Sequence, residues 1–177
     1  FKNEYGNYTT RAVAPSHQFA EKTIVSSGRY LNDNDIKQKK KVAIIGRLVA
    51  RDLFGEEDPI GKFIDIGKTV FKVVGIFKDS GGDNEERLVY IPYTTRQKME
   101  KATKKIGSII VAFKPEIGNS GALALEKQLR EYLKQKKFIA PSDSKGIFIR
   151  ANVSAKPWTP RPIGLCLIFD FLVSGVG

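Results

Sequence analysis

The residues that could carry chemistry begin with a glycine-lysine phrase, GEEDPIGK, at positions 55–62. A phosphate-binding Walker A loop has four residues between its glycines and a Ser or Thr after the lysine, and it follows a strand and opens a helix. Here five residues separate Gly55 from Gly61, and Phe63 follows Lys62. The segment also follows a predicted helix and precedes a predicted strand. The pattern therefore predicts a turn and no nucleotide site.

A second candidate is the polar segment 79–87, DSGGDNEER, in which Asp83, Glu85 and Glu86 follow two glycines. Its spacing lacks the alternating ligands and the closing Glu of an EF-hand calcium loop. We therefore interpret this segment as a solvated hairpin tip.

The only His and the only Cys of the chain, His17 and Cys166, are the remaining reactive side chains. His17 has no catalytic partner within its motif, and Cys166 has no second Cys with which to form a bridge. One His, one Cys and one Met exclude a Cys/His metal cluster and an intrachain disulfide. The sequence thus assigns no catalytic, cofactor-binding or metal-binding residue and no cofactor, and it leaves the residues that contact partners unknown.

Length and composition indicate one or two folded domains. The chain has 177 residues, 41% of them apolar and 28% charged, with a formal net charge of +11. These are values of a globular chain that is neither disordered nor stapled by disulfides. Basic clusters occur at 37–41, 98–105 and 134–137, apart from the aromatic strands, whereas a nucleic-acid platform interleaves stacking aromatics with cations. Solvated faces are therefore the preferred interpretation of these clusters.

The first part of the chain has the pattern of short strands and helices. Strands are predicted at 8–14, 23–26, 42–45 and 88–93, and a helical turn at 16–22. A short amphipathic helix that starts near Leu48 ends at Gly55, and residues 63–66 and 70–77 alternate as a hairpin around Gly67-Lys68. Residues 32–35 read as a turn, Pro92 marks a strand end or an edge strand, and Thr94 or Thr95 is expected to cap a helix that runs to about residue 101.

After residue 105 the pattern becomes α/β. A strand at 109–113 is followed by a helix whose apolar face carries Ala122, Leu125, Leu129 and Leu133, and then by a strand at 147–149. A right-handed crossover places two such strands in parallel, either adjacent or split by a third strand. We therefore predict a β-α-β unit.

The tail leaves two interpretations open. Residues 156–162 hold three prolines and read as a linker, and residues 163–177 are 15 nearly unbroken apolar residues, fewer than the roughly 20 that span a bilayer. They are either the start of a truncated membrane entry or a C-terminal strand or helix, and Asp170 favours the latter because a charge in the bilayer centre is costly. Since residue 1 is Phe and no signal peptide is visible, we expect a fragment.

Residues 27–79 strongly resemble the extracytoplasmic core domain of MacB/FtsX-like ABC transporter permeases. The matching phrases, in order and spacing, are Gly28-Arg29-Tyr30, the A-x-x-L-F of 50–54, the D-P-I-G-K of 58–62 and the V-x-G-I of 73–76. The sequence LVYIPYT at 88–94 also looks like the family's strand before its next helix. The resemblance extends over about residues 7–150.

This resemblance implies a non-catalytic domain that faces the periplasm from the inner membrane and is tethered by flanking membrane helices. Members of the family couple cytoplasmic ATP hydrolysis to export through protein contacts. The implied partners are a second permease copy, an ABC ATPase subunit or domain and, often, a periplasmic adaptor, with no nucleic acid. A basic nucleic-acid-binding module is the alternative function, and a small hydrolase is a third.

The expected fold is α+β, with a β-rich subdomain and a porter-like βαβ lobe. Residues 1–21 are expected to be the remnant of a first porter-like lobe, 22–105 the β-rich inserted subdomain and 106–150 the second porter-like lobe. Residues 151–177 are expected to form a linker and the start of a possible transmembrane segment.

Overall fold

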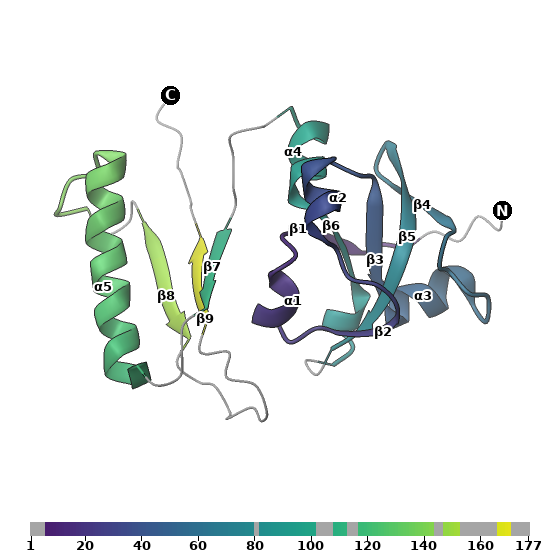
Figure 1. Ribbon diagram of the computed structural model, residues 1–177, viewed down its shortest axis with the longest axis horizontal. Helices are drawn as coiled ribbons and strands as arrows, with labels where there is room; N and C mark the ends of the chain where they lie inside the picture. The colour runs from purple at the N-terminus through teal and green to yellow at the C-terminus, as the bar shows by residue number, and fades with distance from the viewer. Residues whose placement is uncertain are drawn as a thin grey trace. The chain divides into compact units, whose positions relative to one another are not determined.

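The computed structural model describes residues 6–79, 82–101, 108–112, 117–143, 147–152 and 166–170 (Figure 1). The chain divides into two compact units, Phe1–Lys105 and Ile106–Gly177. Within the described ranges, no helix has both the length and the apolar character needed to cross a membrane.

The first unit is a mixed sheet flanked by short helices. Its elements in chain order are β1 (Thr9–Val13), α1 (His17–Ala20), β2 (Ile24–Gly28), α2 (Asp33–Lys37), β3 (Val42–Gly46), α3 (Arg47–Phe54), β4 (Phe63–Ile66), β5 (Thr69–Lys78), the 3-10 turn η1 (Glu85–Arg87), β6 (Leu88–Pro92) and α4 (Tyr93–Met99). The strand order is β1-β6-β3-β5-β2, with β4 also paired to β5. Strand β1 runs parallel to β6 and β3 runs parallel to β5, whereas the β6–β3, β5–β2 and β4–β5 pairs are antiparallel.

Both faces of this sheet carry a hydrophobic core, because alternate residues of each strand point to opposite faces. On one face Ile44, Phe77 and Tyr90 are buried together, and on the other face Ile45 and Val73 pack with α3. Strand β3 is buried along its whole length, as its unbroken apolar sequence indicates. The predicted hairpin of β4 and β5 is confirmed, and so is the α+β class.

Two local predictions are corrected by hydrogen bonds, and one open alternative is decided by the strand order. Residues 32–35 begin helix α2 rather than a simple turn, since Asn32 and Asp35 exchange side-chain and backbone hydrogen bonds as a capping box. Neither Thr94 nor Thr95 caps α4, because their hydroxyls donate to the carbonyls of Ile36 and Lys40, each at 2.8 Å. Of the two alternatives for Pro92, the strand end is right, because β6 lies between β1 and β3.

The phrases Gly28-Arg29 and Val73–Ile76 lie against each other across the sheet. A Cβ on Gly28, whose φ is +72°, would come within 2.3 Å of the Val74 carbonyl oxygen. A Cβ on Gly75 would come within 2.2 Å of the Arg29 carbonyl oxygen. Both positions therefore need glycine to let the two backbones approach, and the Arg29 amide donates to Val74 at 2.9 Å.

The Arg29 side chain holds the start of α2 in place. Its guanidinium donates two hydrogen bonds, of 2.6 and 3.1 Å, to the fully buried carboxylate of Asp35. The Asn32 amide donates a third, of 3.1 Å, to the same carboxylate. Burial alone would raise the pKa of Asp35, but the hydrogen bonds from Arg29 and Asn32 hold that pKa below its usual value.

The second unit contains the predicted β-α-β pattern. Strands β7 (Ser108–Ala112) and β8 (Phe148–Asn152) both pair antiparallel with β9 (Cys166–Asp170), so β7 and β8 are parallel and split by a third strand. Helix α5 (Gly118–Lys137) connects β7 to β8. Its predicted apolar face packs through Leu125, Leu129 and Leu133 against Ile147 and Ile149.

The C-terminal tail supplies the middle strand of that sheet. Of the two interpretations for residues 163–177, a strand describes the part at Cys166–Asp170. The prolines of 156–162 and the rest of the apolar run lie outside the described residues.

The Arg29–Asp35 pair predicts a large effect of a single truncation. We expect Arg29→Ala to destabilise the first unit by about 3 kcal/mol, because removing one partner leaves a buried carboxylate unpaired. The measurement is urea unfolding followed by circular dichroism. The matched control is Arg96→Ala, which breaks an exposed i,i+4 pair with Glu100 and should cost about 0.5 kcal/mol or less. Equal losses in the two variants would contradict this account.

The leucine face of α5 predicts a difference between two identical substitutions on one helix. Leu129→Asp should destabilise the second unit by several kcal/mol because it puts a charge into the contact with β8. Leu123→Asp should have little effect, since Leu123 is 57% exposed. Hydrogen exchange of α5 and β8 peptides distinguishes them, and comparable protection in both variants would show that the buried face is misassigned.

Candidate functional site

The GEEDPIGK segment forms a turn between α3 and β4, and its lysine contacts side chains of the same region. Lys62 forms an ion pair with Glu57, and its ammonium lies 5.6 Å from the centre of the Phe54 ring. The backbone is fixed by a hydrogen bond from the Gly61 amide to Val73, at 2.8 Å. The order helix, turn, strand is the reverse of a phosphate loop, as the sequence predicts.

The polar segment 79–87 is only partly solvated, which corrects the interpretation of a solvated hairpin tip. Glu86 is 5% exposed, and Arg47 donates to its carboxylate at 2.7 and 2.8 Å. A Cβ on Gly46 would come within 2.1 Å of the Glu86 carbonyl oxygen, so η1 lies directly against the end of β3. No local pattern marks Glu86 for burial, because its partner is 39 positions away.

His17 belongs to a buried aromatic cluster on the sheet. Its Nδ1 lies 3.0 Å from the Tyr30 hydroxyl, and its ring meets the Tyr90 ring edge-on at 4.9 Å. Tyr90 in turn stacks on Phe77 at 4.5 Å. Burial, helped by nearby Arg11, lowers the pKa of His17 to about 4. The ring is therefore neutral near pH 7 and holds α1 on the sheet.

The remaining candidates form no metal centre within the described part of the chain. There, no group of three or more His, Cys, Asp or Glu side chains is arranged to hold a metal ion. The backbone of Cys166 lies in β9, in the second unit, whereas His17 lies in the first.

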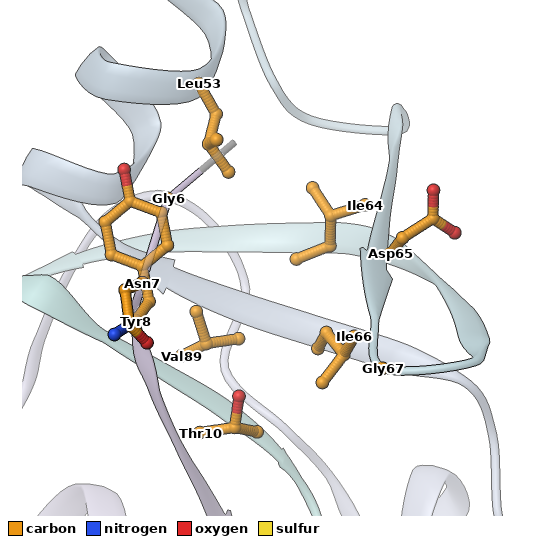
Figure 2. Close-up of a pocket in the computed structure, with 10 residues that line it drawn as sticks. All are labelled: Gly6, Asn7, Tyr8, Thr10, Leu53, Ile64, Asp65, Ile66, Gly67 and Val89. Atoms are coloured by element: carbon orange, nitrogen blue, oxygen red, sulfur yellow. The ribbon is translucent and has the colours of Figure 1, made fainter. Parts of the chain in front are cut away.

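A small groove lies over the sheet between β1, α3 and β4 (Figure 2). Its apolar walls come from Tyr8, Leu53, Ile64, Ile66 and Val89. With a volume of about 220 Å³ it is smaller than the cavities that hold drug-sized ligands, which measure roughly 300 Å³ or more. It has room for an apolar side chain or a few waters.

The groove also lacks a pair of groups for acid-base or nucleophilic catalysis among its lining residues. The polar ones are Asn7, Thr10, Asp65 and the Tyr8 hydroxyl, which donates to Asp52 at 3.4 Å.

The basic clusters lie differently from what their sequence positions indicate. Helices α2 and α4 are in contact, so the segment 37–41 and the start of 98–105 meet at one end of the first unit. The cluster at 134–137 belongs to α5, where Lys134 is buried and donates to the Pro141 carbonyl at 2.5 Å. Within the first unit, the segment 37–41 and the described start of 98–105 therefore belong to neighbouring elements.

The half-buried His17 ring predicts a loss of stability in acid. In the unfolded chain the pKa of His17 is about 6.5, and in the folded chain it is about 4. Between these two values the unfolded chain binds a proton at His17 and the folded chain does not, which favours unfolding. The contribution of His17 to the free energy of unfolding should therefore be fully present above about pH 6.5 and be lost as the pH falls toward 4. The loss should be about 1–2 kcal/mol, because solvent around the ring reduces the effect. His17→Gln should remove this component.

The measurement is the urea midpoint of wild type and variant as a function of pH. Burial raises the pKa of Glu21, which acts in the opposite direction in acid, so the difference between the two proteins isolates His17. Parallel pH profiles for wild type and His17→Gln would contradict a buried neutral ring.

Comparison with known proteins gives one family. Residues 2–128 match the family described as MacB-like periplasmic core domain. The macrolide export ATP-binding/permease protein MacB of Chlorobium luteolum is 31% identical over 125 residues, which are 69% of this chain and 19% of that protein. The protein of the same name from Neisseria gonorrhoeae is 29% identical over 162 residues, or 86% of this chain and 24% of that protein.

Solved structures agree with these relatives. The periplasmic region of MacB from Actinobacillus actinomycetemcomitans superposes with a TM-score of 0.62 at 25% identity, over 72% of this chain and 56% of that one. The extracellular domain of the noncanonic ABC-type transporter YknZ from Gram-positive bacteria gives a TM-score of 0.51 at 25% identity, over 57% and 51%. The chain spans less than a quarter of the length of most of the MacB proteins that it matches and about half of these two structures. On this sequence match and this shared fold, the chain belongs to the family of MacB-like periplasmic core domains.

Proposed function

We propose that the chain is a non-catalytic domain of an ABC-type export permease, held on the periplasmic side of the inner membrane. In this proposal it couples ATP hydrolysis in the cytoplasm to periplasmic export through protein contacts. Its partners are a second copy of the permease, an ABC ATPase subunit or domain and a periplasmic adaptor. Residues 1–21 as the remnant of a first lobe, and 151–177 as a linker into a membrane segment, stay part of the proposal.

One observation supports a mechanical role more than any other. The residues that match the family pattern make up the framework of the first unit: Gly28 and Gly75 allow two backbones to touch, Arg29 fixes α2, and Gly61 ties the turn before β4 to β5. A body that transmits movement must resist deformation, and close backbone packing provides that resistance. The matching residues thus serve rigidity in this structure.

The reactive side chains of the first unit are engaged in the same framework. Lys62 is paired with Glu57, and the His17 ring is packed against Tyr30 and Tyr90. These contacts account for both side chains structurally, which supports a domain whose chemistry is done by another part of the protein.

The Lys62 ion pair predicts that the purified chain does not bind ATP. Calorimetry with ATP and Mg²⁺ should give no heat of binding, either for the wild type or for Lys62→Ala. The substitution should also shift the melting temperature by no more than about 2 °C, since an exposed ion pair contributes little to stability. A micromolar affinity that Lys62→Ala abolishes would contradict the proposal.

The proposed location predicts the labelling of a cysteine in intact cells. In the full-length protein with Cys166→Ala, an Asp83→Cys variant places a thiol on an exposed turn. A membrane-impermeant maleimide should label it once the outer membrane is permeabilised. The matched control is Val73→Cys, which is fully buried and should react only after denaturation. Labelling of Asp83→Cys only after lysis of the inner membrane would overturn the proposed location.

A further inference from the structure

One end of the first unit collects lysines from two distant parts of the chain. The Thr94 and Thr95 hydroxyls donate to the carbonyls of Ile36 and Lys40, which joins the first turn of α4 to α2 and to the segment that follows it, and the two helices are in contact (Figure 1). The exposed lysines of these two segments are Lys37, Lys39, Lys41, Lys98 and Lys101, here called the lysine face. None of the five forms an ion pair with a residue that the structure describes.

At the opposite end of the same sheet, two arginines are paired with acidic side chains. There Arg47 pairs with Glu86 and Arg87 pairs with Asp52, at 2.7 and 3.1 Å. Strands β3 and β6 are antiparallel, so the start of β3 and the end of β6 lie at the same end of the sheet. The segment after α2 leads into β3 and α4 follows β6, which places both at that end. Arg47 follows β3 and Arg87 precedes β6, which places them at the opposite end. The lysine face thus gathers five exposed lysines without ion-pair partners among the described residues, while Lys22 and Lys78 lie at the other end of the strands.

The acids near the lysine face do little to neutralise it. The carboxylate of Asp35 is buried and bound by Arg29, and Glu100 is bound by Arg96. Asp33, in the first turn of α2, is the exposed acid of that helix. The face therefore presents a positive field to a partner.

We propose that the lysine face binds the anionic headgroups of a phospholipid membrane. Lysine is a compact, strongly hydrated cation suited to diffuse attraction by a charged surface, whereas bidentate recognition of one phosphate favours arginine. The face carries none of the exposed aromatic side chains on which nucleic-acid bases stack. The choice of a membrane as the partner rests on the proposed function, which places a membrane beside this domain.

The test is partition of the whole chain onto vesicles of phosphatidylcholine alone or mixed with phosphatidylglycerol. Binding should require phosphatidylglycerol and vanish near 1 M salt, where the Debye length is about 3 Å. Lys39→Gln/Lys98→Gln should weaken the partition about 10- to 30-fold, at about 1 kcal/mol for each lysine near an anionic surface.

The matched control is Lys22→Gln/Lys78→Gln, which removes the same charge from the other end of the sheet. Lys22 precedes β2, whose Ile24 pairs with Lys78 at the end of β5. Lys22 and Lys39 also share a left-handed backbone, with φ of +56° and +50°. This control should change partition by less than about twofold, since both lysines lie away from the proposed contact.

Three results would overturn the inference: equal losses in the two variants, equal binding to phosphatidylcholine alone, or no binding at low salt. Single-stranded DNA binding that depends on Lys39 and Lys98, without vesicle binding, would overturn it in favour of a nucleic acid. Cytoplasmic labelling of Asp83→Cys together with vesicle binding would leave this inference standing and remove the proposed function.

Discussion

The buried carboxylate of Asp35 is the constraint on which the arrangement of the first unit depends. A charge without contact to water is tolerated only when hydrogen bonds replace its hydration, and Arg29 and the Asn32 amide supply them. Arg29 directly follows Gly28, and its carbonyl oxygen lies against Gly75, so the residue that pairs with Asp35 lies where two backbones are in close contact. The conformation of a strand pair, the start of α2 and the surface beyond it are thus set by one ion pair.

Close backbone packing recurs at several glycines of the first unit. Glycines occur where two backbones meet, as at Gly75 against Arg29 and Gly46 against Glu86. A Cβ at either position would lie within about 2.2 Å of a carbonyl oxygen, so either substitution would force the two backbones apart. These glycines therefore allow close backbone contacts that hold the first unit together.

Sequence reasoning succeeded where the physical signal is local. The alternation of β5, the amphipathic face of α3 with its terminal Gly55, and the leucine spacing of α5 each depend on residues within one element. It failed for Asn32, Thr95 and Glu86, whose roles depend on hydrogen bonds or contacts outside the recognised patterns. A capping box of Asn and Asp differs from the usual Ser or Thr with Glu, and a buried hydroxyl that bonds 55 positions away leaves no periodic trace.

The candidate surface could not be found from the sequence for the same reason. Two runs of lysine about 60 positions apart read as separate solvated faces until Thr94 and Thr95 bring them together. Burial of Asp35 then removes from the surface the acid that would have balanced Lys37 and Lys39. The interaction that stabilises α2 thereby also leaves its end positively charged, so stability and surface charge in this unit have a single physical cause.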